Sequence, residues 1–297
     1  MKFFSLLLGF AALTLSGQST IRVNVRLVPL LVTVKDAKGD LVGSLQPSDF
    51  TIYDSGVKQQ ISVFEPNTER PLSISVLIDD SGSTLKDLKY ETTSVKKFLS
   101  ALLSEGNPKD AASIISFNSE VNLLQGFTRN RTRLENSLNL IHPEGGTSLY
   151  DAVYAASDGT RDRDGRHVLV IVTDGDDTTS RVHYPEALKS ALLADAVVYP
   201  IIVVPISNDA GRNVGGENAL VQIARDTGGR HFYPTVGAQL DRAFADILRD
   251  LRKQYMVGYY PRDLPKDAKP FHEVRVQMSR PDLQPSARRG YYGDTAP

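Results

Sequence analysis

The sequence predicts an α/β fold, in which a doubly wound, mostly parallel sheet flanked by helices is inserted into a small β-sandwich. Short apolar runs alternate with helix-period segments across residues 70–253, as in sheets that are covered on both faces. The flanking residues 20–69 and 254–297 show the alternation of half-buried strands instead. Neither flank is large enough to form a core alone, so we expect the two to pack together as one sandwich. Two separate β flaps docked on the central domain are the alternative arrangement.

Residues 1–19 are expected to be a secretory signal peptide. Lys2 supplies the positive end, and Phe3–Leu15 is an apolar stretch too short to span a bilayer as a mature helix. Ser16–Ser19 offers small residues for cleavage. A buried N-terminal helix is the alternative, but the three features occur in the order typical of a signal. We therefore expect an exported mature chain, periplasmic or secreted, without an integral membrane segment.

The first flank is expected to be β-structure throughout. Apolar and polar residues alternate from Ile21 to Leu27, which is the period of a half-buried strand. Turn signals occur at Asp36–Asp40 and Asp54–Gly56. Further strands are expected at Leu30–Val34, Phe50–Tyr53 and Ile61–Phe64.

The central region is expected to alternate buried strands with amphipathic helices. The strand runs are almost wholly apolar, and the helical segments place their apolar residues on one face. Strands are expected at Leu72–Ile78, Ala112–Phe117, Val168–Val172 and Val197–Val204. Helices are expected around Leu85–Leu102, Leu134–Ile141, Ala152–Ala156, Ala187–Ala194, Ala219–Ala224 and Leu240–Leu251.

The last flank returns to β-structure. Tyr255–Tyr259 and Val274–Met278 alternate as strands do, and the polar, proline-containing segment Pro261–Pro270 between them predicts a loop. In the tyrosine pairs Tyr259-Tyr260 and Tyr291-Tyr292, alternate burial on a strand predicts one buried ring per pair.

Composition excludes several classes of function. The 34 Lys and Arg residues balance the 35 Asp and Glu residues of the 297-residue chain, so no basic footprint for nucleic acid is present. The chain contains no Cys, which excludes disulfides, thiolate catalysis, Fe–S clusters, Cys-type zinc sites and a lipidated N-terminal Cys.

Three polar segments far apart in the chain predict one metal site. Asp79-Asp80-Ser81-Gly82-Ser83 and Thr173-Asp174-Gly175 each follow an apolar strand directly, and Gly145-Gly146-Thr147-Ser148 precedes a helix. Their oxygen-bearing side chains suit a hard divalent cation such as Mg²⁺, with Mn²⁺ or Ca²⁺ as alternatives. The expected ligands are Asp79, Ser81, Ser83, Thr147 and Asp174.

The order of these segments along the chain favours a shared site over separate helix caps. Ligands of parallel α/β sheets bind beyond the carboxyl ends of the strands, where Asp79 and Asp174 stand. N-capping by Ser, Thr and Asp would explain any one segment alone. Two carboxylates and three neutral hydroxyls leave a divalent cation under-coordinated, so an acidic oxygen from a partner is expected to complete the shell.

The central region resembles the von Willebrand factor A domain with its metal-ion-dependent adhesion site. Asp79-x-Ser81-x-Ser83, Thr147 and Asp174-Gly175 carry this resemblance, which covers about residues 71–252. It implies that Ser81, Ser83 and Thr147 bind the ion directly, that the aspartates often act partly through water, and that a carboxylate of the ligand completes the shell.

The whole chain also resembles the exported von Willebrand-related proteins of Acidobacteria. That resemblance rests on weaker motifs in Val32–Asp36, Asp49-Phe50, Asp54–Gly56 and Arg289–Tyr291. Asp80 departs from the adhesion-site pattern, in which a small or hydroxyl residue is more usual. We expect Asp80 to face solvent, as also Asp176 and Asp177.

The sequence favours a binding protein over an enzyme. No G-x-S-x-G nucleophile motif or phosphate-binding glycine loop occurs, and the histidines are scattered. A Mg²⁺-dependent hydrolase would use more carboxylates around the metal than this hydroxyl-rich set provides. We expect an exported, metal-dependent adhesion module that binds an Asp or Glu side chain of a protein partner. The alternatives are a structural module with a stabilising metal and a Mg²⁺-dependent hydrolase.

Overall fold

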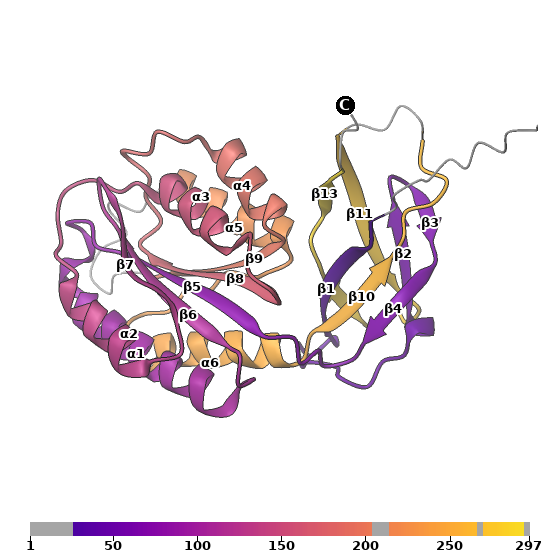
Figure 1. Ribbon diagram of the computed structural model, residues 1–297, viewed down its shortest axis with the longest axis horizontal. Helices are drawn as coiled ribbons and strands as arrows, with labels where there is room; N and C mark the ends of the chain where they lie inside the picture. The colour runs from indigo at the N-terminus through magenta and orange to yellow at the C-terminus, as the bar shows by residue number, and fades with distance from the viewer. Residues whose placement is uncertain (1–25, 204–213, 266–269, 294–297) are drawn as a thin grey trace, which may run out of the picture.

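The computed structural model describes residues 26–203, 214–265 and 270–293, which form two adjoining domains (Figure 1). The expected signal peptide, residues 1–19, lies outside these ranges, as does most of the strand expected from Ile21. Within the described ranges, no helix is both long enough and apolar enough to cross a membrane.

The central domain is built on a five-stranded sheet with the order β7-β6-β5-β8-β9. All neighbouring strands are parallel except the β6–β7 pair, which is antiparallel. This confirms the mostly parallel sheet that the sequence predicts. The strands are β5 (Leu72–Asp79), β6 (Ala111–Phe117), β7 (Val121–Thr128), β8 (Arg166–Thr173) and β9 (Ala196–Ile202).

Strand β7 was not expected from the sequence. It is an edge strand with no fully buried residue, and its pairing with β6 shifts register twice. A strand with this irregular register does not keep the alternating pattern by which half-buried strands are recognised.

Helices cover both faces of the sheet, as in a doubly wound fold (Figure 1). On one face Val95, Phe98 and Phe244 pack with the β5 residues Ile74 and Val76. On the other face Leu149, Ala187 and Leu220 pack with Leu77 and Leu169. The first face carries α1 (Leu88–Glu105), α2 (Arg131–Ser137) and α6 (Ala238–Arg252), and the second carries α3 (Leu149–Thr160), α4 (Tyr184–Leu193) and α5 (Val214–Thr227).

The second domain is a β-sandwich that unites the two ends of the described chain. One sheet has the order β12-β1-β10-β4 and the other β13-β11-β2-β3, so each sheet mixes strands from before and after the central domain. This pairing supports one sandwich and rules out two separate flaps. The strands are β1 (Val28–Lys35), β2 (Phe50–Asp54), β3 (Val57–Gln59), β4 (Ile61–Glu65), β10 (Tyr255–Tyr259), β11 (Phe271–Met278), β12 (Gln284–Ser286) and β13 (Gly290–Tyr292).

A buried carboxylate organises the sandwich core. Asp54 has no exposed surface, and its Oδ2 accepts hydrogen bonds from the Tyr259 hydroxyl at 2.9 Å and the Tyr291 hydroxyl at 2.8 Å. Tyr259 is fully buried whereas Tyr260 is 41% exposed, so the expected alternation within that tyrosine pair is confirmed.

Strand order sets the place where a ligand would bind. The chain leaves the central strand β5 for β6 on one side and later returns to β8 on the other side, which makes the β5–β8 boundary a switch point. Ile78 pairs with Val172, so the loops that begin at Asp79 and Asp174 leave the sheet side by side. Such a boundary is where open parallel sheets bind ligands.

Candidate functional site

The loop after β5 brings the first three expected ligands together. The Asp79 Oδ1 accepts a hydrogen bond from the Ser81 backbone N–H at 2.9 Å, and the Ser81 and Ser83 hydroxyl oxygens lie 3.1 Å apart. The Thr84 hydroxyl lies 3.0 Å from both the Asp79 and the Ser81 carbonyl oxygens, which fixes the turn. Ser83 is exposed whereas Asp79 and Ser81 are buried, so the set opens to solvent on the Ser83 side.

Strand β8 holds the other Asp79 oxygen. The Thr173 hydroxyl donates to Asp79 Oδ2 at 2.6 Å and accepts from the Gly175 N–H at 3.0 Å. Burial raises the pKa of Asp79 to about 7; the hydrogen bonds from Ser81 and Thr173 oppose that rise, and the nearby charge of Asp174 adds to it. The two aspartates therefore interact electrostatically across the β5–β8 boundary.

Asp174 carries an oxygen without a donor. Its side chain is half-buried, and the Oδ1 atom is inaccessible to water and has no hydrogen-bond partner. Leaving a buried polar atom unpaired costs about 1–3 kcal/mol, and more when the group is charged. A cation bound at this edge would remove that cost.

The Thr147 loop lies between the two aspartate loops. The Glu144 N–H donates to the Asp80 carbonyl at 3.0 Å, and the Thr147 carbonyl accepts from the N–H groups of Thr178 and Thr179 at 2.8 and 3.1 Å. Within the described ranges, however, no hydrogen bond joins the Thr147 side chain to the other expected ligands. The structure thus gathers all three loops at one edge. The Thr178 hydroxyl accepts from the Thr147 N–H at 2.9 Å, and the Ser148 and Thr179 hydroxyl oxygens lie 2.8 Å apart.

Asp80 corrects one expectation from the sequence, because it does not face solvent. It is 2% exposed, and burial raises the pKa of its carboxyl group to about 6. Its Oδ1 atom is buried without a hydrogen-bond partner. The residue leaves the end of β5 pointing into the protein, so the site holds one more interior carboxyl group than expected.

Asp176 and Asp177 also depart from the solvent-facing expectation, since both are half-buried. The Asp177 Oδ1 accepts hydrogen bonds from the Ser180 hydroxyl at 2.5 Å and the Tyr150 N–H at 3.2 Å. Its partner Tyr150 stands in the first turn of α3, so Asp177 anchors the start of that helix.

Glu91 is an acidic residue of this region that the sequence analysis missed. It lies on the inner face of α1, is 1% exposed, and its Oε2 atom has no hydrogen-bond partner. Burial, followed by the negative charges of Asp79, Asp87 and Asp174, raises its pKa well above the usual value. A signal was available, because Glu91 falls between Leu88 and Val95 at helical spacing, where an apolar residue is expected.

These acidic groups lack an ion-pair partner in the part of the chain that the structure describes. Among residues 26–203, 214–265 and 270–293, no ion pair joins Asp79, Asp80, Glu91 or Asp174 to Lys, Arg or His. Nor do three His, Asp or Glu side chains there form a metal-binding group by themselves. The hydroxyl oxygens of Ser81, Ser83 and Thr147 would have to complete any coordination shell, and neutral oxygen ligands of this kind suit Mg²⁺ or Ca²⁺. The residues present therefore fit a divalent cation.

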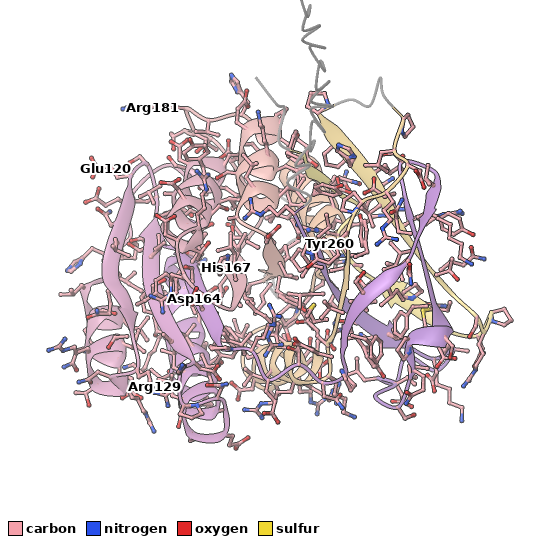
Figure 2. The ribbon with its side chains drawn as sticks, turned by 45° about the vertical axis from the view of Figure 1, so that its right-hand side comes forward. Glu120, Arg129, Asp164, His167, Arg181 and Tyr260 are labelled. Carbon is pink, nitrogen blue, oxygen red and sulfur yellow. The ribbon has the colours of Figure 1, made fainter. Side chains whose placement is uncertain are left out.

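Figure 2 separates this edge of the sheet from the opposite one. Glu120 follows β6 and Arg181 follows β8, and both mark the edge that carries the candidate site. Asp164 and His167 lie at the other end of β8, where the His167 ring nitrogens contact the carbonyl oxygens of Ala194 and Arg163 at 2.5 and 2.8 Å. His167 is therefore remote from the serines of the site.

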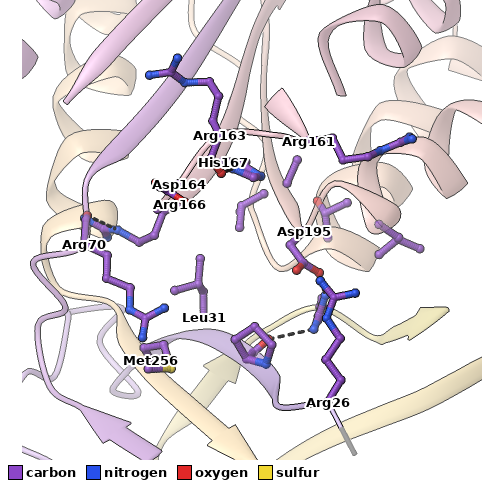
Figure 3. A pocket seen from close by; sticks show the side chains of 17 residues that line it. Arg26, Leu31, Arg70, Arg161, Arg163, Asp164, Arg166, His167, Asp195 and Met256 are labelled. Atoms are coloured by element: carbon purple, nitrogen blue, oxygen red, sulfur yellow. Dashed lines mark hydrogen bonds and ion pairs between the residues drawn. The ribbon is translucent and has the colours of Figure 1, made fainter. Parts of the chain in front are cut away.

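A cavity of about 260 Å³ at that opposite end lies between the two domains (Figure 3). Six arginines line it, and the contacts of Arg288 and Arg166 serve the domain joint. Arg288 pairs with Asp195 and donates to the Pro29 carbonyl at 2.9 Å, while Arg166 donates to the carbonyls of Leu251 and Arg70. Arg163 points away from the cavity in Figure 3. The arginines do not converge on a common point.

Comparisons with known proteins identify the central domain. The family model of the von Willebrand factor type A domain matches residues 74–176, which include all five expected ligands. The von Willebrand domain of the type V pili tip protein Mfa5 from Porphyromonas gingivalis is 15% identical with a TM-score of 0.51, over 61% of this chain and 95% of that chain.

Two further solved structures are similar to part of this chain. BatB from Bacteroides thetaiotaomicron is 18% identical with a TM-score of 0.48, over 61% of this chain and 99% of that chain. The PilB minor pilin from Streptococcus sanguinis is 13% identical with a TM-score of 0.48, over 63% and 62% of the two chains. No protein of curated function matches the sequence. The two findings agree: residues 74–176 match the family model of the von Willebrand factor type A domain, and the central α/β domain has the fold of the Mfa5 domain.

Proposed function

We propose that this chain is an exported protein-binding module that recognises an acidic side chain of its partner through a divalent cation. Mg²⁺ is the expected ion, with Mn²⁺ or Ca²⁺ as alternatives. The residues that would hold it are Asp79, Ser81, Ser83, Thr147 and Asp174. One observation carries the proposal: carboxyl groups gather at the β5–β8 edge with unpaired buried oxygens, and no Lys, Arg or His among the described residues forms an ion pair with them.

The arrangement of the site suits recognition. The Ser81 N–H and the Thr173 hydroxyl fix the two Asp79 oxygens, so this carboxylate is oriented before any ion arrives. A bound cation would supply positive charge that the neutral hydroxyls do not cancel. Ser83 leaves one side of the site open to solvent, and an acidic side chain of a partner would approach from that side.

The relatives give this role a biological setting. Mfa5, whose von Willebrand domain shares this fold, is a type V pili tip protein. The N-terminal segment of the present chain has the features of a signal peptide, which agrees with export to the periplasm or beyond. These two considerations support a binding role at the cell surface or in the periplasm.

Metal binding can be tested by calorimetry on the purified chain. We expect Mg²⁺ or Mn²⁺ to bind at one site, and Asp79→Ala and Thr147→Ala to abolish or strongly weaken binding. Asp158→Ala is a matched control, because this side chain is 61% exposed on α3 and belongs to none of the three loops. Unchanged binding in both site variants would refute the site assignment.

Partner binding needs a second experiment. The chain is immobilised and exposed to the extracytoplasmic proteins of its source organism with Mg²⁺ or with a chelator. We expect a protein that is retained only with Mg²⁺ and released when an acidic residue on its surface is replaced by its amide. Retention that is indifferent to chelator and to Asp79→Ala would contradict cation-bridged recognition.

A purely structural cation is the second candidate, and the depth of the acidic groups favours it. Asp79, Asp80 and Glu91 are each at most 2% exposed, so an ion that balances their charge would stabilise the domain. In this case chelation would lower the melting temperature while partner retention stayed the same. Measuring both quantities on the same samples separates the two roles.

A further inference from the structure

The two edges of the central sheet differ in how they are covered. At the β9 edge, the Ile202 N–H donates to the Phe232 carbonyl at 2.8 Å and the Phe232 N–H donates to the Pro200 carbonyl at 2.9 Å, so a further segment lies along that strand. At the β7 edge, no backbone hydrogen bond within the described ranges joins residues 121–128 to a segment other than β6. An uncovered edge strand offers its unpaired backbone groups to another chain.

Strand β7 has few of the features that keep edge strands from pairing. It is eight residues long and contains neither a charged residue nor a proline, so its protection is limited to the two shifts of register against β6. Leu123 projects from this strand with 66% of its surface exposed, more than any other large apolar side chain among the described residues. The edge is therefore both unpaired and apolar.

An apolar hollow of about 270 Å³ lies beside Leu123, between β7 and α3. Gly126 also borders this hollow, and a Cβ atom there would meet nothing within 4 Å. A projecting leucine next to an apolar hollow makes the surface self-complementary, as an interface about a two-fold axis requires. The apolar lining includes Ile115, Val121, Phe127, Ala155 and Ala156.

The two ends of β7 carry opposite charges. Glu120 precedes the strand and Arg129 follows it, and Figure 2 shows them at its two ends. Both side chains are exposed, and neither forms an ion pair with another residue that the structure describes. The guanidinium of Arg129 donates to three neutral backbone carbonyls, at 2.8, 2.9 and 3.3 Å, which leaves its charge unbalanced. Two copies of β7 in antiparallel contact would bring these opposite charges together twice.

We propose that β7 binds β7 of a second copy of this chain, antiparallel, about a two-fold axis between positions 124 and 125. This register places Leu123 opposite Gly126 of the second copy, and Glu120 opposite Arg129 of the second copy. The axis is perpendicular to the sheet, so both α3 helices lie on one face and each Leu123 enters the hollow of the other copy. The two sheets become continuous, and the two candidate metal sites open in opposite directions. This inference does not depend on the proposed metal site.

The first test is self-association of the purified chain, followed by sedimentation velocity in chelator so that divalent cations play no part. We expect a monomer–dimer equilibrium within about 1–500 μM, because an interface built on one strand is small. Raising the salt concentration from about 0.05 M to about 0.5 M should weaken the dimer, since its ion pairs are exposed. A chain that stays monomeric up to the highest concentration overturns the proposal, whether β7 binds nothing or an extended peptide of another protein.

Substitutions on the surface of β7 identify the interface. Leu123→Lys should abolish the dimer, because an ammonium group is not stable in the apolar hollow. Leu193→Lys is the matched control, since this leucine is 45% exposed at the end of α4, and it should leave the dimer intact. Glu120→Lys should raise the Kd of the dimer by about tenfold or more, because like charges then meet at both ends of the strand.

Folding is monitored by the melting temperature of each monomer, which should be unchanged because Leu123 and Glu120 are exposed. A dimer that persists in both Leu123→Lys and Glu120→Lys forms through another surface, and that result overturns the inference. Asp79→Ala should dimerise as the unaltered chain does, so failure of the metal site and failure of this interface are distinguishable.

The register can be tested by cross-linking, because the chain contains no Cys of its own. Residues directly opposite in antiparallel strands have Cα atoms about 4.5–5.5 Å apart, within reach of a disulfide. Leu123→Cys mixed with Gly126→Cys should therefore give a disulfide-linked dimer on oxidation. Either variant alone should give far less, since identical positions lie about 10 Å apart in this register. Equal cross-linking in the mixture and in the single variants would contradict the register.

Discussion

Asp79 makes the metal-free protein sensitive to pH. Its folded-state pKa of about 7 lies above the usual 3.8, so the folded chain binds this proton more tightly than the unfolded chain does. Between these two values the folded state therefore loses stability as the pH rises. A shift of this size corresponds to a loss on the order of 4 kcal/mol over the window. Asp80 and Glu91, whose pKa values are also raised, act in the same direction.

We therefore expect the unfolding free energy in chelator to fall between about pH 5 and pH 7.5, as measured by urea denaturation. Asp79→Asn should reduce this fall, since the amide does not titrate. Saturating Mg²⁺ should also reduce it, because the ion favours the ionised carboxylate. A metal-free stability that is constant over this range would show that Asp79 is not desolvated as the structure indicates.

Tyr259 gives a second prediction for a single residue. Its hydroxyl donates to the fully buried Asp54 carboxylate, so Tyr259→Phe removes one of the donors that balance this charge. We expect a loss of about 1.5–3 kcal/mol in the unfolding free energy, the range for hydrogen bonds to charged groups. Tyr260→Phe is the matched control, since its ring is 41% exposed, and it should change stability by less than about 0.5 kcal/mol.

Among the elements, helix α5 sets the position of the Asp174 loop. Gly216, near the start of α5, lies so close to this loop that a Cβ atom there would come within 1.9 Å of the Gly175 carbonyl oxygen. Any side chain at this position therefore pushes the helix and the loop apart. Because Asp174 immediately precedes Gly175, the displacement would move an expected ligand of the cation.

Gly216→Ala should therefore weaken Mg²⁺ binding and lower the melting temperature. Gly159→Ala is the control, since Gly159 lies in α3 and a Cβ there meets nothing within 4 Å. That substitution should leave metal binding unchanged and raise stability by up to about 1 kcal/mol, because alanine favours helix. Equal metal affinity in the two variants would mean that α5 does not position the loop.

The sequence predicts the long buried strands but not the short or irregular ones. The buried strands β5, β6, β8 and β9 follow from apolar runs, because a strand covered on both faces needs apolar side chains throughout. The three-residue strands β3 and β12 are too short to show a period, and β7 is irregular.

In the candidate site, too, some side-chain positions follow from the local sequence and others depend on tertiary contacts. Asp79, Ser81 and Ser83 meet after β5, as expected for ligands of one site. The direction of Asp80 depends on how the loop leaves β5, where its N–H donates to the Phe117 carbonyl at 3.0 Å, and no local pattern encodes that contact. The burial of Arg288 likewise arises from a partner 93 positions away in the chain.

The two domains are joined by contacts that involve both ends of the sandwich. Arg288, between β12 and β13, is 9% exposed and pairs with Asp195 in the turn before β9, while its other guanidinium nitrogen donates to the Pro29 carbonyl of β1. Nearby, the Arg289 N–H donates to the Asp226 carbonyl of α5 at 3.0 Å. The C-terminal segment thus holds the sandwich against the domain that carries the candidate site.

Arg288→Gln should loosen this joint more than it disturbs either core. Asp195 is 52% exposed and stays hydrated when its partner is lost, so we expect a moderate cost of about 1–3 kcal/mol, mainly from the Pro29 carbonyl and the lost packing of the side chain. Limited proteolysis should cut the variant faster between the domains, after α6 or before β5. Arg280→Gln, which alters an exposed ion pair with Asp282, should leave the cleavage rate unchanged. The joint lies at the amino ends of the strands, whereas the candidate site lies at their carboxyl ends. Mg²⁺ affinity should therefore be the same in both variants. A loss of affinity in Arg288→Gln alone would show that contact with the sandwich affects the site.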